Sequence, residues 1–108
     1  MTKPAVFLTG GDNVNWALDE DQRLTRQALE DIVDFSPVKA CQVVHSVSAL
    51  EIAAMPESLL LNKKVICHIP AEPFRYLTYP FFWKALERVG LWIVQSRQAL
   101  AQLNSLRV

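Results

Sequence analysis

The sequence predicts an α/β fold, with a parallel sheet of about four strands between two layers of helices, a Rossmann-like three-layer sandwich. Three observations support this prediction. Short apolar runs rich in β-branched residues alternate four times with segments of helical periodicity. Each apolar run is continuous, as in strands that are buried on both faces. The segments between the runs are long enough for right-handed crossovers that join parallel strands.

Four segments have the length and composition of buried strands. They are residues 5–8, 40–44, 65–67 and 91–94. Gly10 and Gly11 follow the first, where they allow a tight turn and close approach of a ligand. His45 and Ser46 are expected to close the second strand, and His68 the third, ahead of Pro70 and Pro73.

The first helix is expected to begin at Asp19, with Gln22 at capping-box spacing, and to end before Pro37. Its apolar stripe comprises Leu24, Ala28, Leu29, Ile32 and Val33. The acidic residues of its first turn are explained by the helix dipole, so they are not taken as catalytic carboxylates.

Three further helices follow. One runs from a capping box at Ser48 and Glu51 to Pro56. Another starts near Phe82 and is capped by Gly90. Ser96 is expected to cap the last one, whose apolar stripe comprises Ala99, Leu100, Leu103 and Leu106.

Composition excludes several classes of protein. A chain of 108 residues, 51% hydrophobic and 20% charged, fits one globular domain and not a disordered segment. The net charge of zero argues against a general nucleic-acid binder or an anionic-membrane binder. No apolar stretch is long enough to span a membrane, and the first residues lack a signal-peptide core. Cys41 and Cys67 are expected to be free, buried thiols, which favours a cytoplasmic setting.

The residues that end parallel strands share one edge of the sheet, where open α/β folds bind ligands. Here that edge is expected to carry Gly10 and Gly11, His45 and Ser46, His68, and Ser96. His68 is the preferred functional residue, while His45 fits a site role and a structural hydrogen bond equally well. No third ligand has matching spacing, so a metal site is not predicted. No GxSxG elbow is present, which argues against a Ser-His-Asp triad.

Three motifs together resemble a known family. They are Val-Val-His-Ser at 43–46, Lys-Val-Ile-Cys-His-Ile-Pro at 64–70 and Leu-Trp-Ile-Val-Gln-Ser-Arg-Gln-Ala-Leu-Ala-Gln-Leu at 91–103. This series resembles the amino-terminal domain of GT-B glycosyltransferases, in particular the large retaining family that uses nucleotide-sugar donors. The resemblance implies that residues 1–108 form one Rossmann-like domain, the acceptor-side half of a two-domain enzyme.

The resemblance also implies roles for individual residues. Gly10 and Gly11 would approach the phosphates of the donor, and His68 would lie near the transferred sugar. His45 and Ser46 would line the acceptor cleft, and Ser96 would start the helix that leads toward a second domain. That carboxy-terminal domain would supply most of the contacts to the nucleotide-sugar donor, so this chain alone would be inactive.

No cofactor is expected, and the net charge and the short apolar runs already argue against a nucleic-acid partner and a transmembrane segment. Peripheral membrane association is left open. Two other functions stay open on the residues alone. One is a small Rossmann-like or flavodoxin-like interaction module without chemistry. The other is a nucleotide-binding or phosphate-binding domain.

Overall fold

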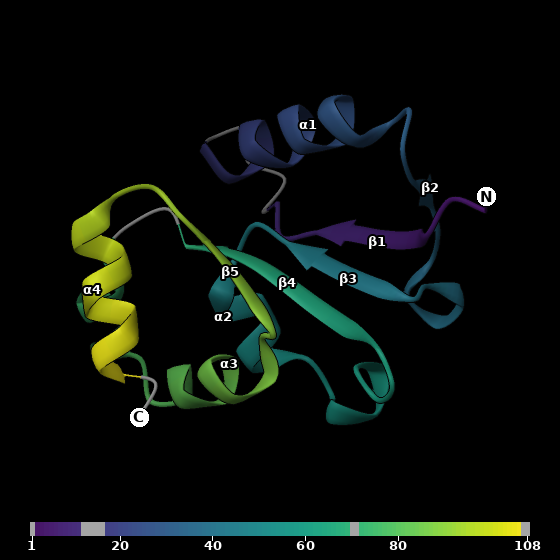
Figure 1. The fold of residues 1–108 in the computed structure, drawn as a ribbon. Coiled ribbons are helices and arrows are strands. Elements are labelled where there is room, and N and C mark those ends of the chain that lie inside the picture. Colours follow the sequence, from purple (N-terminus) through teal and green to yellow (C-terminus); the bar gives the residue numbers. More distant parts are fainter. Residues whose placement is uncertain (1, 12–16, 70–71, 107–108) are drawn as a thin grey trace.

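The computed structural model describes residues 2–11, 17–69 and 72–106 (Figure 1). Asp12, Asn13 and Pro70, which the sequence assigns to turns, lie outside these ranges. The elements in chain order are β1 (Ala5–Thr9), α1 (Ala17–Leu29), β2 (Asp34–Phe35), η1 (Val38–Ala40), β3 (Val43–Ser46), α2 (Ala49–Ala54), η2 (Glu57–Leu59), β4 (Lys64–Ile69), η3 (Pro73–Thr78), α3 (Phe82–Arg88), β5 (Leu91–Val94) and α4 (Arg97–Leu106), where η denotes a 3-10 helix.

The predicted parallel sheet is confirmed, with one strand more than expected. Five strands pair in the order β2-β1-β3-β4-β5, and every pairing is parallel. The additional strand, β2, has two residues and lies in the segment predicted as the end of the first helix. Its sequence, Asp34-Phe35, contains no apolar run, so its extended conformation depends on pairing with β1.

Helices flank the sheet on both sides, with α1 on one face and α2 and α3 on the other (Figure 1). The main core lies on the α2 and α3 side, because alternate strand residues point to that face. Its members are Cys41, Val44, Ala49, Ile52, Ala53, Leu60, Val65, Cys67, Ile69, Phe82, Ala85 and Val89. Cys41 and Cys67 are buried free thiols, as predicted.

The opposite face of the sheet is covered unevenly. At the β1 end Val6 and Leu8 are buried, whereas Leu91 and Ile93 of β5 are 56% and 41% exposed. The helix on this face, α1, has no buried residue, and its Leu24 is 48% exposed. The expectation of a sheet covered on both faces is therefore met at β1, which α1 contacts, and wrong at β5, whose Leu91 and Ile93 remain exposed.

Two strands end later than predicted, and one of them also begins later. Pro37 is followed by η1, so the segment predicted to start at Ala40 becomes extended only at Val43. The strand then continues through His45 and closes at Ser46, its last residue, as predicted. His68 likewise lies inside β4, because its pairing with Ile93 extends the ladder beyond Cys67.

The predicted boundaries of the first helix are wrong at both ends. α1 begins at Ala17, two residues before Asp19, and ends at Leu29, well before Pro37. The Gln22 side chain does not complete a capping box. Its Oε1 accepts a hydrogen bond of 2.7 Å from the Gly11 backbone N–H, which ties the loop after β1 to α1.

The predicted caps have mixed outcomes. Ser48 precedes α2 as expected, but its side chain makes no capping hydrogen bond. Gly90 is not the cap of α3, because Val89 ends that helix in an extended conformation. The cap at Ser96 is confirmed, since its Oγ accepts a 3.0 Å hydrogen bond from the Ala99 N–H in α4.

Candidate functional site

The carboxyl ends of the strands define the candidate site. The register pairs Thr9 with Ser46 and Ser46 with Cys67, so Gly10 and His68 lie at the same edge of the sheet. β2 lies on one side of β1, and β3, β4 and β5 follow on the other side. The gap between β1 and β3 is thus a topological switch point, where open α/β sheets bind ligands.

The two histidines of the chain meet at this edge. His45 of β3 pairs in register with Ile66 of β4, so His45 and His68 share a face and lie diagonally across neighbouring strands. Their Nε2 atoms are 2.8 Å apart, and their ring centroids are 4.9 Å apart. At that distance one imidazole donates its Nε2–H and the other accepts it.

Burial keeps this pair neutral. His45 is 7% exposed, and burial together with the neighbouring His68 lowers the pKa of His45 to about 4. Burial also lowers the pKa of His68, and the carboxylate of Asp21 on α1 opposes that shift. At neutral pH the site therefore presents two uncharged imidazoles joined by a hydrogen bond.

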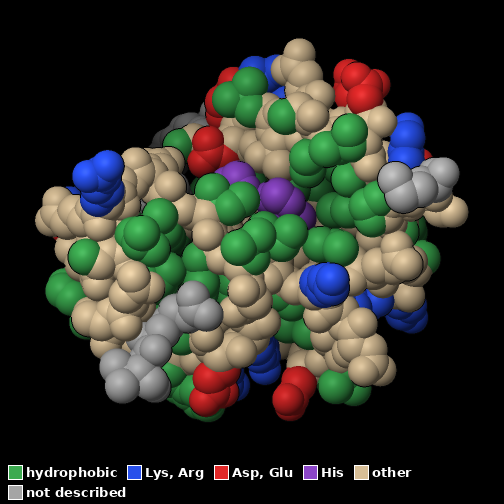
Figure 2. All heavy atoms as spheres, in the orientation of Figure 1, with side chains coloured by type: hydrophobic (Ala, Val, Ile, Leu, Met, Phe, Trp, Pro, Cys, Tyr) green, Lys and Arg blue, Asp and Glu red, His purple; other side chains and the backbone are tan. Residues whose placement is uncertain are grey.

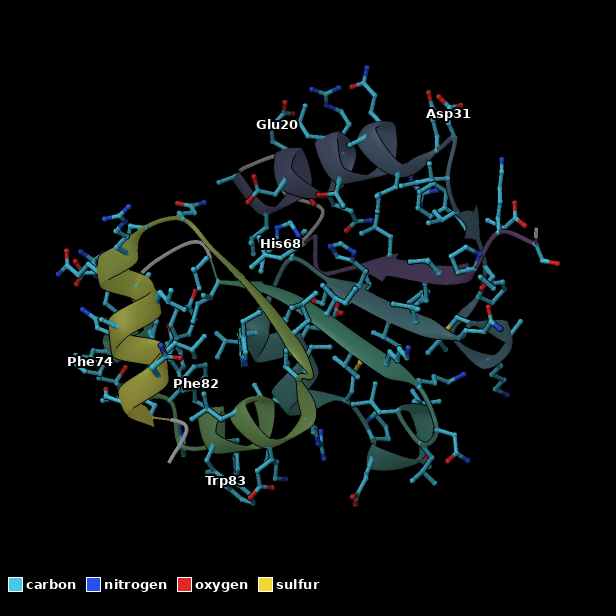
Figure 3. The ribbon with its side chains drawn as sticks, in the orientation of Figure 1. Glu20, Asp31, His68, Phe74, Phe82 and Trp83 are labelled. Carbon is cyan, nitrogen blue, oxygen red and sulfur yellow. The ribbon has the colours of Figure 1, made fainter. Side chains whose placement is uncertain are left out.

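The pair is visible from outside the molecule. Figure 2 shows both imidazoles at the surface of this face, among hydrophobic side chains. In Figure 3, His68 lies between the sheet and the start of α1. His45 is the more buried partner and His68 is half-buried, so His68 is the member with more access to a ligand.

Gly10 and Gly11 follow β1 as predicted, and both pack tightly against the chain itself. Gly10 has a φ of +110°, and a Cβ atom there would lie 2.7 Å from the backbone nitrogen of Val47. A Cβ atom on Gly11 would lie 2.5 Å from a carboxylate oxygen of Asp19. The fold of the loop thus requires glycine at Gly10, independently of any ligand, whereas at Gly11 the close neighbours are the ends of the Asp19 and Gln22 side chains, which can move.

Glu51 is a residue of this edge that sequence reasoning missed. Its carboxylate accepts hydrogen bonds from the Thr9 hydroxyl at 3.0 Å and the Ser46 hydroxyl at 3.4 Å, and a backbone hydrogen bond from Gly10. Burial raises the pKa of Glu51, while these hydrogen bonds act in the opposite direction. The signal in the sequence was an acidic residue next to Ile52 and Ala53, which are buried in α2. From the sequence alone, this acid was interpreted only as part of a capping box.

The two serines of the predicted site have different surroundings. Ser46 is fully buried, and its hydroxyl accepts a hydrogen bond from the Ser48 N–H at 3.0 Å. Its one proton is shared between the Ser48 carbonyl at 2.9 Å and the Glu51 carboxylate at 3.4 Å. Ser96 lies two residues beyond the end of β5, is exposed, and caps α4. Ser46 therefore orders the loop after β3, and Ser96 lies at the rim.

The described residues offer no cluster for a metal ion. Within 2–11, 17–69 and 72–106, no group of three or more His, Cys, Asp or Glu side chains is placed to share one. Two imidazoles fall short of the three protein ligands typical of catalytic zinc. None of the helices in these ranges is long and apolar enough to cross a membrane.

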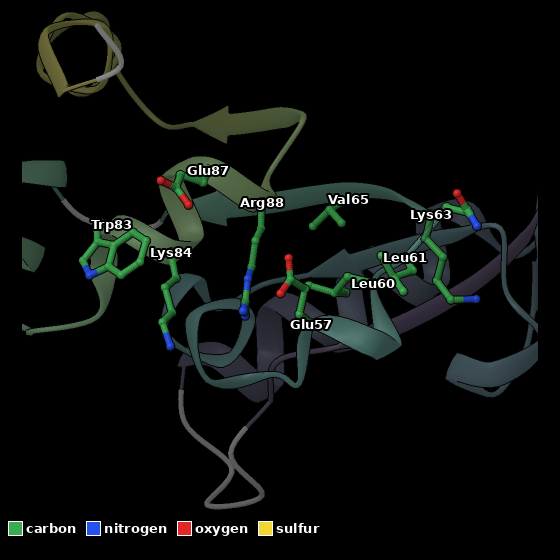
Figure 4. A pocket seen from close by; sticks show the side chains of 10 residues that line it. Glu57, Leu60, Leu61, Lys63, Val65, Trp83, Lys84, Glu87 and Arg88 are labelled. Carbon is green, nitrogen blue, oxygen red and sulfur yellow. The ribbon is translucent and has the colours of Figure 1, made fainter.

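A separate hollow of about 530 Å³ lies at the amino-terminal end of β4, away from the histidine pair (Figure 4). Trp83 and Lys84 of α3 line one end of it, and Leu61 and Lys63 line the other. The Lys63 ammonium group donates a 2.8 Å hydrogen bond to the Cys41 carbonyl, so it already has a partner within the chain. This hollow lies at the opposite end of the strands from the edge that the sequence singled out.

Comparisons with models of protein families, with curated proteins and with solved structures found no match to this chain. The site is therefore defined by the chain's own geometry, which comprises a neutral histidine pair, a glycine loop at the switch point and a buried carboxylate behind that loop.

Proposed function

We propose that this chain is the acceptor-side, amino-terminal half of a glycosyltransferase that moves a sugar from a nucleotide-sugar donor to an acceptor. The observation that carries the proposal is the hydrogen-bonded pair of His45 and His68 at the carboxyl edge of a parallel sheet. A neutral imidazole at that edge suits a reaction between hydroxyl-bearing substrates, because it can donate or accept a hydrogen bond without adding charge.

In this proposal His68 contacts the reacting sugar, and Ser96 contributes to the rim of the acceptor cleft. Gly10 and Gly11 give the donor phosphates a close approach to the backbone. Most donor contacts come from a second domain, which makes this chain inactive alone. The proposed setting is cytoplasmic, in keeping with two buried free cysteines.

Peripheral membrane association is part of the same proposal. Its support is an exposed aromatic pair, Phe81 and Trp83, with the Lys84 ammonium 5.0 Å and 5.9 Å from the two ring centroids. Aromatic rings beside a lysine suit the headgroup region of a bilayer. Co-sedimentation with lipid vesicles tests it: the wild type should bind, and a double change to serine at Phe81 and Trp83 should abolish binding. A wild type that stays in the supernatant would refute it.

The second candidate is a Rossmann-like or flavodoxin-like module that binds a partner or a nucleotide without chemistry. Two observations favour it. The strand order β2-β1-β3-β4-β5 is the flavodoxin-like order. The exposed Leu91 and Ile93 leave an apolar strip of sheet open to a partner.

A transfer assay separates these functions. In the longest natural polypeptide that contains this chain, His68→Ala is expected to lower the rate of sugar transfer by about 100-fold. Gln98→Ala, on the exposed surface of α4, should leave the rate unchanged. An unchanged rate for His68→Ala would remove His68 from the mechanism. Saturable binding of nucleotide-sugars by residues 1–108 alone would favour the nucleotide-binding module.

A further inference from the structure

We propose that His45 is a positioning residue: it occupies the Nε2 of His68, so that His68 meets its ligand through Nδ1, and the two rings carry opposite tautomers. This inference deepens the proposed function and rests on it only for its catalytic consequence. The geometry stands on its own, because the two Nε2 atoms are 2.8 Å apart.

The proton count leads to the opposite tautomers. A neutral imidazole carries one N–H, at either Nδ1 or Nε2. If both rings carried the proton on Nε2, two N–H groups would point at each other. If neither did, two lone pairs would face each other at 2.8 Å. Only one Nε2 is therefore protonated, and the other ring holds its proton on Nδ1.

The consequence concerns the nitrogen that a ligand encounters. Since the Nε2 of His68 is used by His45, Nδ1 is the His68 nitrogen left for a hydroxyl or a phosphate oxygen. If His45 donates, that Nδ1 carries a proton and donates to the ligand. If His45 accepts, Nδ1 is a lone pair that can accept a proton from an acceptor hydroxyl. The tautomer of the buried ring thus selects the role of the accessible one.

The surroundings of the two imidazoles keep both rings uncharged. His68 acts electrostatically on His45, and the carboxylate of Asp21 on α1 acts on His68. Burial lowers the pKa of both imidazoles, so the pair stays neutral over the pH range in which most enzymes work. A neutral pair is the state in which the tautomer argument applies.

Nitrogen NMR of the 108-residue chain labelled at histidine tests the inference without any activity assay. At pH 7 we expect one ring in the Nε2–H form, the other in the Nδ1–H form, and a scalar coupling between the two Nε2 nuclei across the hydrogen bond. Both rings in the Nε2–H form, or no coupling between the Nε2 nuclei, would overturn the inference.

Two variants extend the test. His45→Leu removes the partner, so the coupling disappears and His68 becomes a mixture of tautomers. His45→Gln offers either an N–H or a carbonyl oxygen, so it keeps a hydrogen bond to the Nε2 of His68 without fixing the tautomer of that ring. A His68 Nε2 shift that shows no hydrogen bond in this variant would count against positioning by hydrogen bonding. If His45→Leu does not fold, the spectra of the wild type and of His45→Gln still test the inference.

In the longest natural polypeptide, His45→Leu is expected to lower kcat for sugar transfer by at least about tenfold with little change in KM, and His45→Gln to restore much of it. If the two rings carry opposite tautomers but the polypeptide does not transfer sugar, the proposed function is refuted and the inference about the tautomers stands. Equal tautomers would defeat the inference whatever the activity.

Discussion

Gly10→Ala provides the most decisive test of how the loop after β1 is built. Gly10 has a φ of +110°, a conformation that side chains disfavour by about 1–3 kcal/mol. An added Cβ would also lie 2.7 Å from the Val47 nitrogen and 2.8 Å from both the Ser46 hydroxyl and the Ser48 nitrogen. Two of these three neighbours are backbone atoms, which cannot rotate away. Forcing an atom into such a site costs about 1–3 kcal/mol more.

The two contributions together predict that Gly10→Ala lowers the free energy of unfolding by about 3 kcal/mol. That is a large part of the roughly 5–15 kcal/mol by which a domain is stable. Urea denaturation followed by circular dichroism measures it, and a slope of about 1–3 kcal/mol per molar converts the loss into a midpoint shift of about 1–3 M.

Gly90→Ala is the matched control. Its added Cβ would come no closer than 3.7 Å to any neighbour, the Val65 carbonyl oxygen, and its φ lies outside the left-handed region. We expect a change in the free energy of unfolding within about 0.5 kcal/mol. Equal stability of Gly10→Ala and the wild type would refute the packing argument. If nucleotide-sugar binding then failed as well, Gly10 would be present for the ligand alone.

Three further predictions concern the core, the histidine pair and a thiol. Ile69→Ala, at a fully buried position, should cost about 2–5 kcal/mol in urea unfolding, whereas Ile93→Ala, on the exposed strip of β5, should cost less than about 1 kcal/mol; equal losses would mean that β5 is covered on both faces. Because the folded pKa of His45 is about 4, against an ordinary value of 6.5, the unfolded chain binds a proton first as the pH falls. The wild type should therefore lose up to about 3 kcal/mol relative to His45→Gln between pH 6.5 and 4, measured as urea midpoints; parallel pH profiles would contradict the buried neutral imidazole. Burial raises the pKa of the Cys67 thiol to about 12, so Cys67 should resist alkylation at pH 8 until the chain unfolds, and rapid labelling of the native chain would show an open core.

Local signals in the sequence were sufficient for several elements. The strand at 91–94 and the helix beginning at Phe82 were placed correctly, because the first is a short continuous apolar run and the second has apolar residues at helical spacing. The cap at Ser96 follows from a side chain and a backbone N–H three residues apart. The shared edge of Gly10 and His68 follows from parallel strands alone.

Local sequence patterns could not predict the features that depend on pairing between segments far apart in the chain. β2 is extended because it pairs with β1, and its two residues carry no strand pattern of their own. The contact between His45 and His68 depends on the register of β3 against β4, and a shift of one residue would place the rings on opposite faces. Glu51 belongs to the edge because α2 packs its first turn against Thr9 and Ser46, which a helical pattern does not specify.

The uneven cover of the sheet and the histidine pair are connected. On the β1 side, Leu8 is buried in the same row as His45, so this side of the pair is closed. On the β5 side, His68 pairs in register with Ile93, which is 41% exposed. In the proposed function, a ligand would reach His68 from the side of β4 and β5, where Ile93 is exposed. Ile93, whose truncation is predicted to cost little stability, thus lies beside the open side of the histidine pair.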